Sequence, residues 1–187
     1  MASITHIMSD KYCAPMPVEL TMIKMADRDS FQVNDSGGRL IFKMDVHAQC
    51  STLLDVGGNL ILTARRKLFS MHGKWEVCRG EQVSLFMVKR KSWLQLKPHL
   101  TVFLCGNDNN GTPDFEVRGN CKETGGQIFR GDNLVAVFKC KFTFKNVMLG
   151  KDTFVTWVAP GVDQAFIACL VIIMEYATAS ASPDVTF

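Results

Sequence analysis

The stretch VDQAFIACLVIIMEYA, residues 162–177, decides the fold because it is apolar on every face of a helix. Its uninterrupted apolar run covers only ten residues, Ala165 to Met174, and Asp163 and Glu175 stand close to its two ends. A bilayer core requires about 20 mostly apolar residues, and charges at such positions are costly in lipid. We therefore predict no transmembrane span, but a helix that is buried on all sides inside a folded domain.

The residues before this stretch mark the start of a helix. Pro160 and Gly161 interrupt the preceding segment, and Asp163 falls in the first turn, where a negative charge suits the helix dipole. A helix of this kind needs apolar partners on every side, which the rest of the chain must supply.

The composition is that of one globular domain. The chain has 187 residues, 47% of them hydrophobic and 21% charged, with a net charge of +3. This mild charge, without a basic module, gives no strong signal for nucleic-acid binding. We expect a flexible N-terminus over residues 1–11, one domain over residues 12–177 and a flexible tail over residues 178–187.

The cysteines indicate a reducing compartment. There are seven, they are scattered, and no CxxC pair occurs. The first residues, MASITHIMSDKYCAP, lack the layout of a signal peptide. We therefore predict free thiols and an intracellular, cytoplasmic location, with peripheral membrane or nuclear association also open.

Most of the chain alternates apolar and polar residues with period two, which is typical of strands. Apolar segments flank glycine-containing or Asx-containing turns at residues 35–38, 56–58 and 130–133, which predicts β-hairpins. Roughly ten or more strands followed by one apolar helix favour a closed antiparallel barrel, because closure removes exposed edges. The interior of such a barrel is too wide for strand side chains alone, so the helix of residues 162–177 would fill it.

Several motifs, in this order, closely resemble plant LURP-one-related proteins. They are YCAPMPVELTM (12–22), GGNLILTARRKLFSMHGKWEVCRG (57–80), LFMVKRKSWLQLKPHLTVFL (85–104) and LGKDTFVTWVAPGVDQAFIACLVIIMEYA (149–177). The resemblance implies a mainly β, tubby C-terminal-like fold: a barrel of about twelve strands around one central hydrophobic helix near the C-terminus. This agrees with the fold that the residue pattern predicts.

The resemblance implies less about function. The family has been suggested to be related to tubby-like proteins, whose barrels bind phosphoinositides and tether transcription regulators to membranes, and to phospholipid scramblases. Members have been linked to plant defence, and no established enzymatic activity comes with the family. A shared fold is weak support for a shared function, so these remain expectations.

The sequence contains no recognisable catalytic motif. The GxSxG, HExxH, P-loop and GxGxxG patterns are all absent, and the histidines are dispersed at positions 6, 47, 72 and 99. We predict a protein that is not an enzyme, with no cofactor and no metal site.

Clusters of cations are the better candidates for a functional site. The predicted headgroup-binding residues are Arg65, Arg66, Lys67, Lys89, Arg90, Lys91 and Trp93. The first three end one strand, the next three would form the turn before Trp93, and Lys139, Lys141 and Lys145 would decorate a third strand. Lysine and arginine attract anionic phospholipid headgroups, and tryptophan favours the membrane interface. The alternative interpretation is a solvated face that keeps the barrel soluble.

We thus predict a non-enzymatic barrel module that binds anionic phospholipid headgroups, such as phosphoinositides, or a protein partner. A scramblase-like membrane protein, with the helix of residues 162–177 inserted in lipid, and a purely structural scaffold are the alternatives. Trp75 and Trp157 stand in alternating strands, so we expect both to pack in the barrel.

Overall fold

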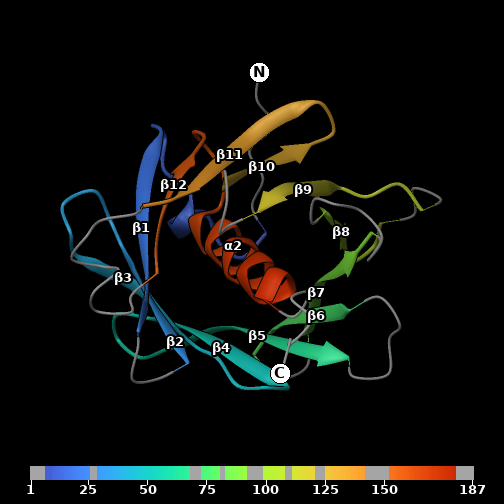
Figure 1. The fold of residues 1–187 in the computed structure, drawn as a ribbon, viewed down its shortest axis with the longest axis horizontal. Coiled ribbons are helices and arrows are strands. Elements are labelled where there is room, and N and C mark those ends of the chain that lie inside the picture. Colours follow the sequence, from blue (N-terminus) through green and yellow to red (C-terminus); the bar gives the residue numbers. More distant parts are fainter. Residues whose placement is uncertain are drawn as a thin grey trace, which may run out of the picture.

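Twelve antiparallel strands form a closed barrel around one helix in the computed structural model (Figure 1). The structure describes residues 7–25, 29–67, 73–80, 83–91, 99–107, 111–120, 125–141 and 152–179. The predicted barrel with a central helix is confirmed.

Each strand pairs with its neighbours along the chain, as expected for hairpins, and β1 closes the barrel by pairing with β12. The strands are β1 (Val18–Met25), β2 (Ser30–Asn34), β3 (Leu40–Asp45), β4 (Cys50–Asp55), β5 (Leu60–Lys67), β6 (Lys74–Arg79), β7 (Val83–Arg90), β8 (His99–Leu104), β9 (Phe115–Asn120), β10 (Gly125–Arg130), β11 (Asn133–Cys140) and β12 (Thr153–Val158). The three hairpin turns predicted from glycine and Asx residues join β2 to β3, β4 to β5 and β10 to β11.

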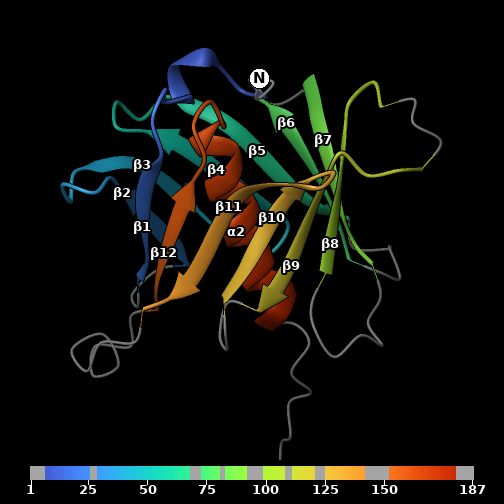
Figure 2. The ribbon, with the colours of Figure 1, turned by 90° about the horizontal axis from the view of Figure 1, so that it is seen from above.

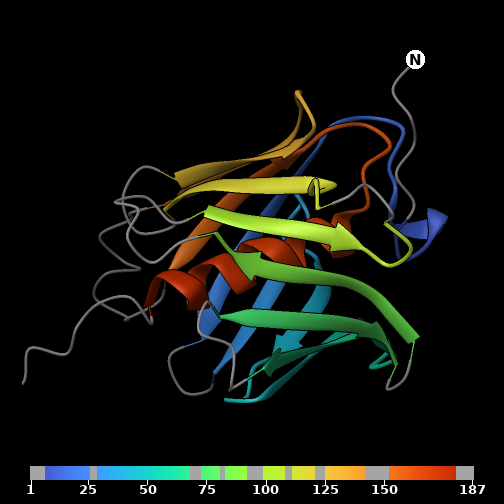
Figure 3. The ribbon, with the colours of Figure 1, turned by 90° about the vertical axis from the view of Figure 1, so that its right-hand side faces the viewer.

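The helix α2 (Gln164–Ala179) lies inside this ring of strands, as Figures 2 and 3 show from two further directions. All its residues from Ala165 to Glu175 are buried. Phe166 packs against rings from two strands, with centroid distances of 5.0 Å to Phe86 and 4.9 Å to Phe115. No helix within the described residues is long and apolar enough to cross a membrane.

Structure extends past both ends of the predicted domain of residues 12–177. The backbone N–H of Met8 donates a 2.7 Å hydrogen bond to the Asp163 carboxylate, and the Met8 side chain is buried. Helix α2 continues beyond residue 177, and Thr178 is buried. The flexibility of residues 1–11 and 178–187 stays a prediction. Residues 1–6 and 180–187 lie outside the described residues.

Trp157 is also placed differently from the prediction. Trp75 is buried at 7% exposure, but Trp157 lies on the outer face of β12 with 40% of its surface exposed. Both faces of the β12 sequence TFVTWV carry apolar residues, so the alternation does not reveal which face is inside. The side chains of Phe154, Thr156 and Val158 are the ones that turn toward the core.

Candidate functional site

Strand direction brings the predicted cations to one end of the barrel, the end at which α2 finishes. There β5 ends at Lys67, β6 begins at Lys74 and β7 ends at Arg90. The guanidinium Nη1 of Arg90 donates a 3.3 Å hydrogen bond to the carbonyl oxygen of Ala177, near the end of the helix. We call this the α2 C-terminal end.

The strand register divides these cations between the two faces of the sheet. Arg66 lies opposite Trp75, and Trp75 opposite the fully buried Val88, so this row faces the barrel interior. Lys67 lies opposite Lys74, and Lys74 opposite Lys89, in the next row along the strands. Because adjacent rows point to opposite faces, the three lysines lie side by side on the outside.

We define the outer cations as Arg65, Lys67, Lys74, Lys89 and Lys91. Two of them have acidic partners: Lys67 Nζ lies 2.7 Å from Glu76 Oε2, and Lys91 Nζ lies 3.9 Å from Glu116 Oε1. The hydrogen bond from Lys67 lowers the pKa of Glu76. Lys89 lies over the ring of Phe103, 4.5 Å from its centroid.

Three outer cations have no such partner. Within the described part of the chain, no carboxylate oxygen lies within 4.0 Å of the charged groups of Arg65, Lys74 or Lys89. Like charges directly opposite one another on neighbouring strands are destabilising. The row of Lys67, Lys74 and Lys89 therefore concentrates positive charge that Glu76 balances only in part.

We define the inner cations as Lys24, Arg66 and Arg90, which face the barrel interior around the end of α2. Lys24 lies opposite the buried Phe31, with its Nζ 3.9 Å from Glu175 Oε1 and 5.4 Å from the centroid of the Tyr176 ring. Arg90 lies opposite the buried Leu100 and contacts the helix end. A cation near a helix C-terminus is stabilised by the helix dipole, so Lys24 and Arg90 have a structural role here.

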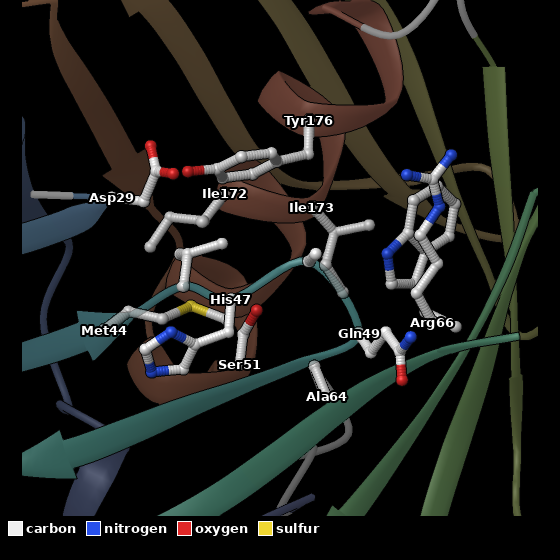
Figure 4. Close-up of a pocket in the computed structure, with 13 residues that line it drawn as sticks. Asp29, Met44, His47, Gln49, Ser51, Ala64, Arg66, Ile172, Ile173 and Tyr176 are labelled. Atoms are coloured by element: carbon white, nitrogen blue, oxygen red, sulfur yellow. The ribbon is translucent and has the colours of Figure 1, made fainter. Parts of the chain in front are cut away.

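Arg66 differs from the other two because it lines a pocket of about 150 Å³ (Figure 4). Its guanidinium carbon lies 5.9 Å from the centroid of the Trp75 ring. The pocket is lined by Asp29, Met44, Val46, His47, Ala48, Gln49, Ser51, Ala64, Arg66, Trp75, Ile172, Ile173 and Tyr176. Burial raises the pKa of Tyr176 to about 12, with Asp29 and Glu175 adding to the effect, so its hydroxyl stays neutral near pH 7.

Sequence reasoning thus found six of these cations but not their arrangement. Lys89 and Arg90 lie inside β7 and not in a turn, contrary to the prediction. Lys139 and Lys141 are exposed at the end of β11, as expected. Trp93 and Lys145 lie outside the described residues.

Several residues of this end were missed. The alternation in KWEVCRG could have placed Lys74 on the face opposite Trp75, and hence beside the outer cations. The sequence does not predict that Lys24 and Asp29 lie near the end of α2, because only the pairing of β1 with β12 places them there.

Metal and disulfide chemistry find no support in the part of the chain that is described. Cys13, Cys50, Cys78, Cys105, Cys140 and Cys169 form no disulfide. No group of three or more histidine, cysteine or acidic side chains among the described residues could hold a metal ion.

Comparisons with known proteins agree on one family. The LURP-one-related family model matches residues 18–175. Protein LURP-one-related 15 of Arabidopsis thaliana is 39% identical over 183 residues, which cover 90% of this chain and 84% of that protein. Protein LURP1 of the same species is 35% identical over 182 residues, which cover 90% and 87%. An X-ray structure of an Arabidopsis thaliana protein superposes with a TM-score of 0.71 at 31% identity, covering 91% of this chain and 97% of the other.

Proposed function

We propose that this chain, which belongs to the LURP-one-related family as its motifs predicted, is a barrel module that binds anionic phospholipid headgroups through its outer cations. The observation that carries this proposal is the row of Lys67, Lys74 and Lys89 on the outer face of three adjacent strands. Arg65 and Lys91 extend the same positive surface.

The unpaired cations set the strength of the proposed binding. A lysine or arginine near an anionic membrane contributes about 1 kcal/mol. Lys67 and Lys91 already contact carboxylates, so they contribute less than Arg65, Lys74 and Lys89. The sum of roughly 3 kcal/mol for three such cations supports reversible attachment that weakens at high salt.

The proposal includes no catalytic step. Phosphoinositide preference, a role in plant defence and a cytoplasmic location with peripheral membrane or nuclear association remain predictions from the resemblance and the composition. The scramblase-like alternative required the apolar helix to insert into lipid. Since the side chains from Ala165 to Glu175 are buried among the strands, such insertion would require the barrel to open.

Sedimentation with phospholipid vesicles tests the proposal. The wild type is expected to sediment with phosphatidylcholine vesicles that contain a phosphoinositide, and to remain in solution with phosphatidylcholine alone. The double variant Lys74→Glu/Lys89→Glu should lose at least about 2 kcal/mol of binding free energy, a loss of affinity of at least roughly thirtyfold, because two attractions are replaced by repulsion.

A matched control separates a local site from general charge. Lys11 lies near the start of α2 and Lys43 on β3, both away from the row on β5 to β7. Lys11→Glu/Lys43→Glu changes the net charge by the same amount and should bind nearly as well as the wild type. Equal losses in both double variants, or no vesicle binding by the wild type at moderate salt, would overturn the proposal.

A further inference from the structure

The pocket beside Arg66 is separate from the outer cations, because Arg66 and its neighbours Arg65 and Lys67 lie on opposite faces of β5. We infer that this pocket binds a small organic monocarboxylate, with its carboxylate on the Arg66 guanidinium and its apolar body over α2. This inference goes beyond the proposed membrane contact and does not depend on it.

The floor of the pocket is apolar and comes from both the helix and the barrel wall. Ile172 and Ile173 contribute from α2, and Met44 and Ala64 from two strands (Figure 4). Trp75 of a third strand, β6, also lines the pocket. These side chains belong to the same buried core, which fixes their positions. An apolar body that enters the pocket would therefore meet a surface that is already formed.

Arg66 is available for an anion. Among the residues that the structure describes, no carboxylate oxygen lies within 4.0 Å of its guanidinium. Its backbone N–H donates a 2.9 Å hydrogen bond to the carbonyl oxygen of Gln49, and its side chain lies over the Trp75 ring. The Arg66 side chain is exposed, and a guanidinium presents two parallel N–H donors that match the two oxygens of a carboxylate.

The size of the pocket limits the ligand. A cavity of about 150 Å³ in another protein takes up benzene, so the present volume fits a body of about one ring. Polar groups of the lining, including Ser51 and the neutral hydroxyl of Tyr176, can orient such a ligand.

The surrounding charges favour one negative charge over two. Asp29 lies on the side of the pocket opposite Arg66 (Figure 4), and the negative end of the α2 dipole lies close by. Glu175 is also buried near this end, 3.9 Å from Lys24. A phosphate monoester, with nearly two charges, would meet more repulsion here than a carboxylate does.

An NMR titration of the isotope-labelled protein tests the inference with benzoate as the probe. Benzoate should produce saturable shifts at the backbone amides of Ala48, Gln49, Ile172 and Ile173. Benzamide, which has the same shape without the charge, and phenyl phosphate should each bind at least about tenfold more weakly.

Two neighbouring arginines provide the matched variants. Arg66→Gln should weaken benzoate binding about tenfold and leave benzamide unchanged, because only the charged hydrogen bonds are lost. Arg65→Gln removes the same charge from the outer face and should leave benzoate affinity unchanged. Equal binding of benzoate and benzamide, equal losses in both variants, or no saturable shifts at these amides would overturn the inference. Vesicle binding by Arg66→Gln should stay at the wild-type level, so the two proposals can fail separately.

Discussion

The two ends of the barrel use their charged groups differently. At the end where α2 begins, the buried carboxylate of Asp163 accepts four backbone hydrogen bonds, from Ala165 and Phe166 at the start of the helix and from Met8 and Ser9 of the N-terminal segment. At the α2 C-terminal end, no carboxylate oxygen of the described residues lies within 4.0 Å of the charged groups of Arg65, Arg66, Lys74 and Lys89. The hydrogen bonds of Asp163 stabilise the fold, whereas the cations at the α2 C-terminal end have positive charge available for binding.

The hairpin turns strengthen this contrast. Asp35 and Asp55 lie at the end where α2 begins, and each accepts hydrogen bonds from backbone N–H groups of its own turn, at 2.9 to 3.0 Å. Asp163 also connects residues that are 155 positions apart in the sequence. We therefore expect substitutions of these aspartates to affect stability, and substitutions of Arg65, Arg66, Lys74 and Lys89 at the other end to affect binding.

The largest loss of stability should follow from placing a charge in α2, which packs against the strands along the barrel interior. Ile167 and Val171 are buried, at 0% and 1% exposure. Ile167→Asp or Val171→Asp should abolish soluble, cooperative folding, because a buried unpaired carboxylate costs several kcal/mol against a total stability of about 5 to 15 kcal/mol. Thermal denaturation followed by circular dichroism measures this, with Ile167→Val as a control that should lose only about 1 kcal/mol. Cooperative unfolding of either Asp variant would contradict the enclosed position of α2.

The next effect concerns Asp163 alone. Asp163→Ala removes the helix N-cap and leaves the N–H groups of Met8 and Ser9 without their acceptor, so we expect a loss of about 3 kcal/mol in the free energy of unfolding. Asp163→Asn keeps one oxygen acceptor, but its NH₂ group must face one of the two donor pairs, so its loss should be smaller than that of the alanine variant. Burial raises the pKa of Asp163, which its four hydrogen bonds oppose. Chemical denaturation at neutral pH measures both variants, and equal losses would show that the single oxygen that asparagine retains contributes no stability.

Much of the fold could be predicted from the sequence because the signals are local. Period-two alternation and turn residues specify each hairpin, and the apolar stretch that ends in Glu175 is too short for lipid but suited to a barrel interior. Hairpins between successive strands also fix β5, β6 and β7 as neighbours. The cations of these strands could therefore be found, but their division into inner and outer sets required the register.

The remaining features depend on contacts between distant parts of the chain. Asp163 was predicted only as a favourable charge in the first turn, because nothing in the sequence pairs it with Met8. Lys24 meets Glu175, and Asp29 shares a pocket with Arg66, only after β1 has paired with β12. Such contacts follow from closure of the barrel and leave no periodic signal in the sequence.

The smallest expected effect is a pH dependence that separates the two ends. At the α2 C-terminal end, burial lowers the pKa of His99 below the ordinary 6.5; Glu116 opposes this shift, and Lys91 and Arg118 favour it. The unfolded chain then binds the proton more readily, so stability is full above pH 6.5 and declines as the pH falls below that value. At the other end, the backbone hydrogen bond from Asn59 lowers the pKa of Asp55, so the stability from that turn is kept until the pH falls below about 3.8.

Hydrogen exchange between pH 7 and 5 should therefore accelerate at the paired amides of Leu100 and Val117 but not in the turn at Asp55, after correction for the intrinsic rates. His99→Gln should remove this difference, and an unchanged pH dependence in that variant would assign the effect to another group.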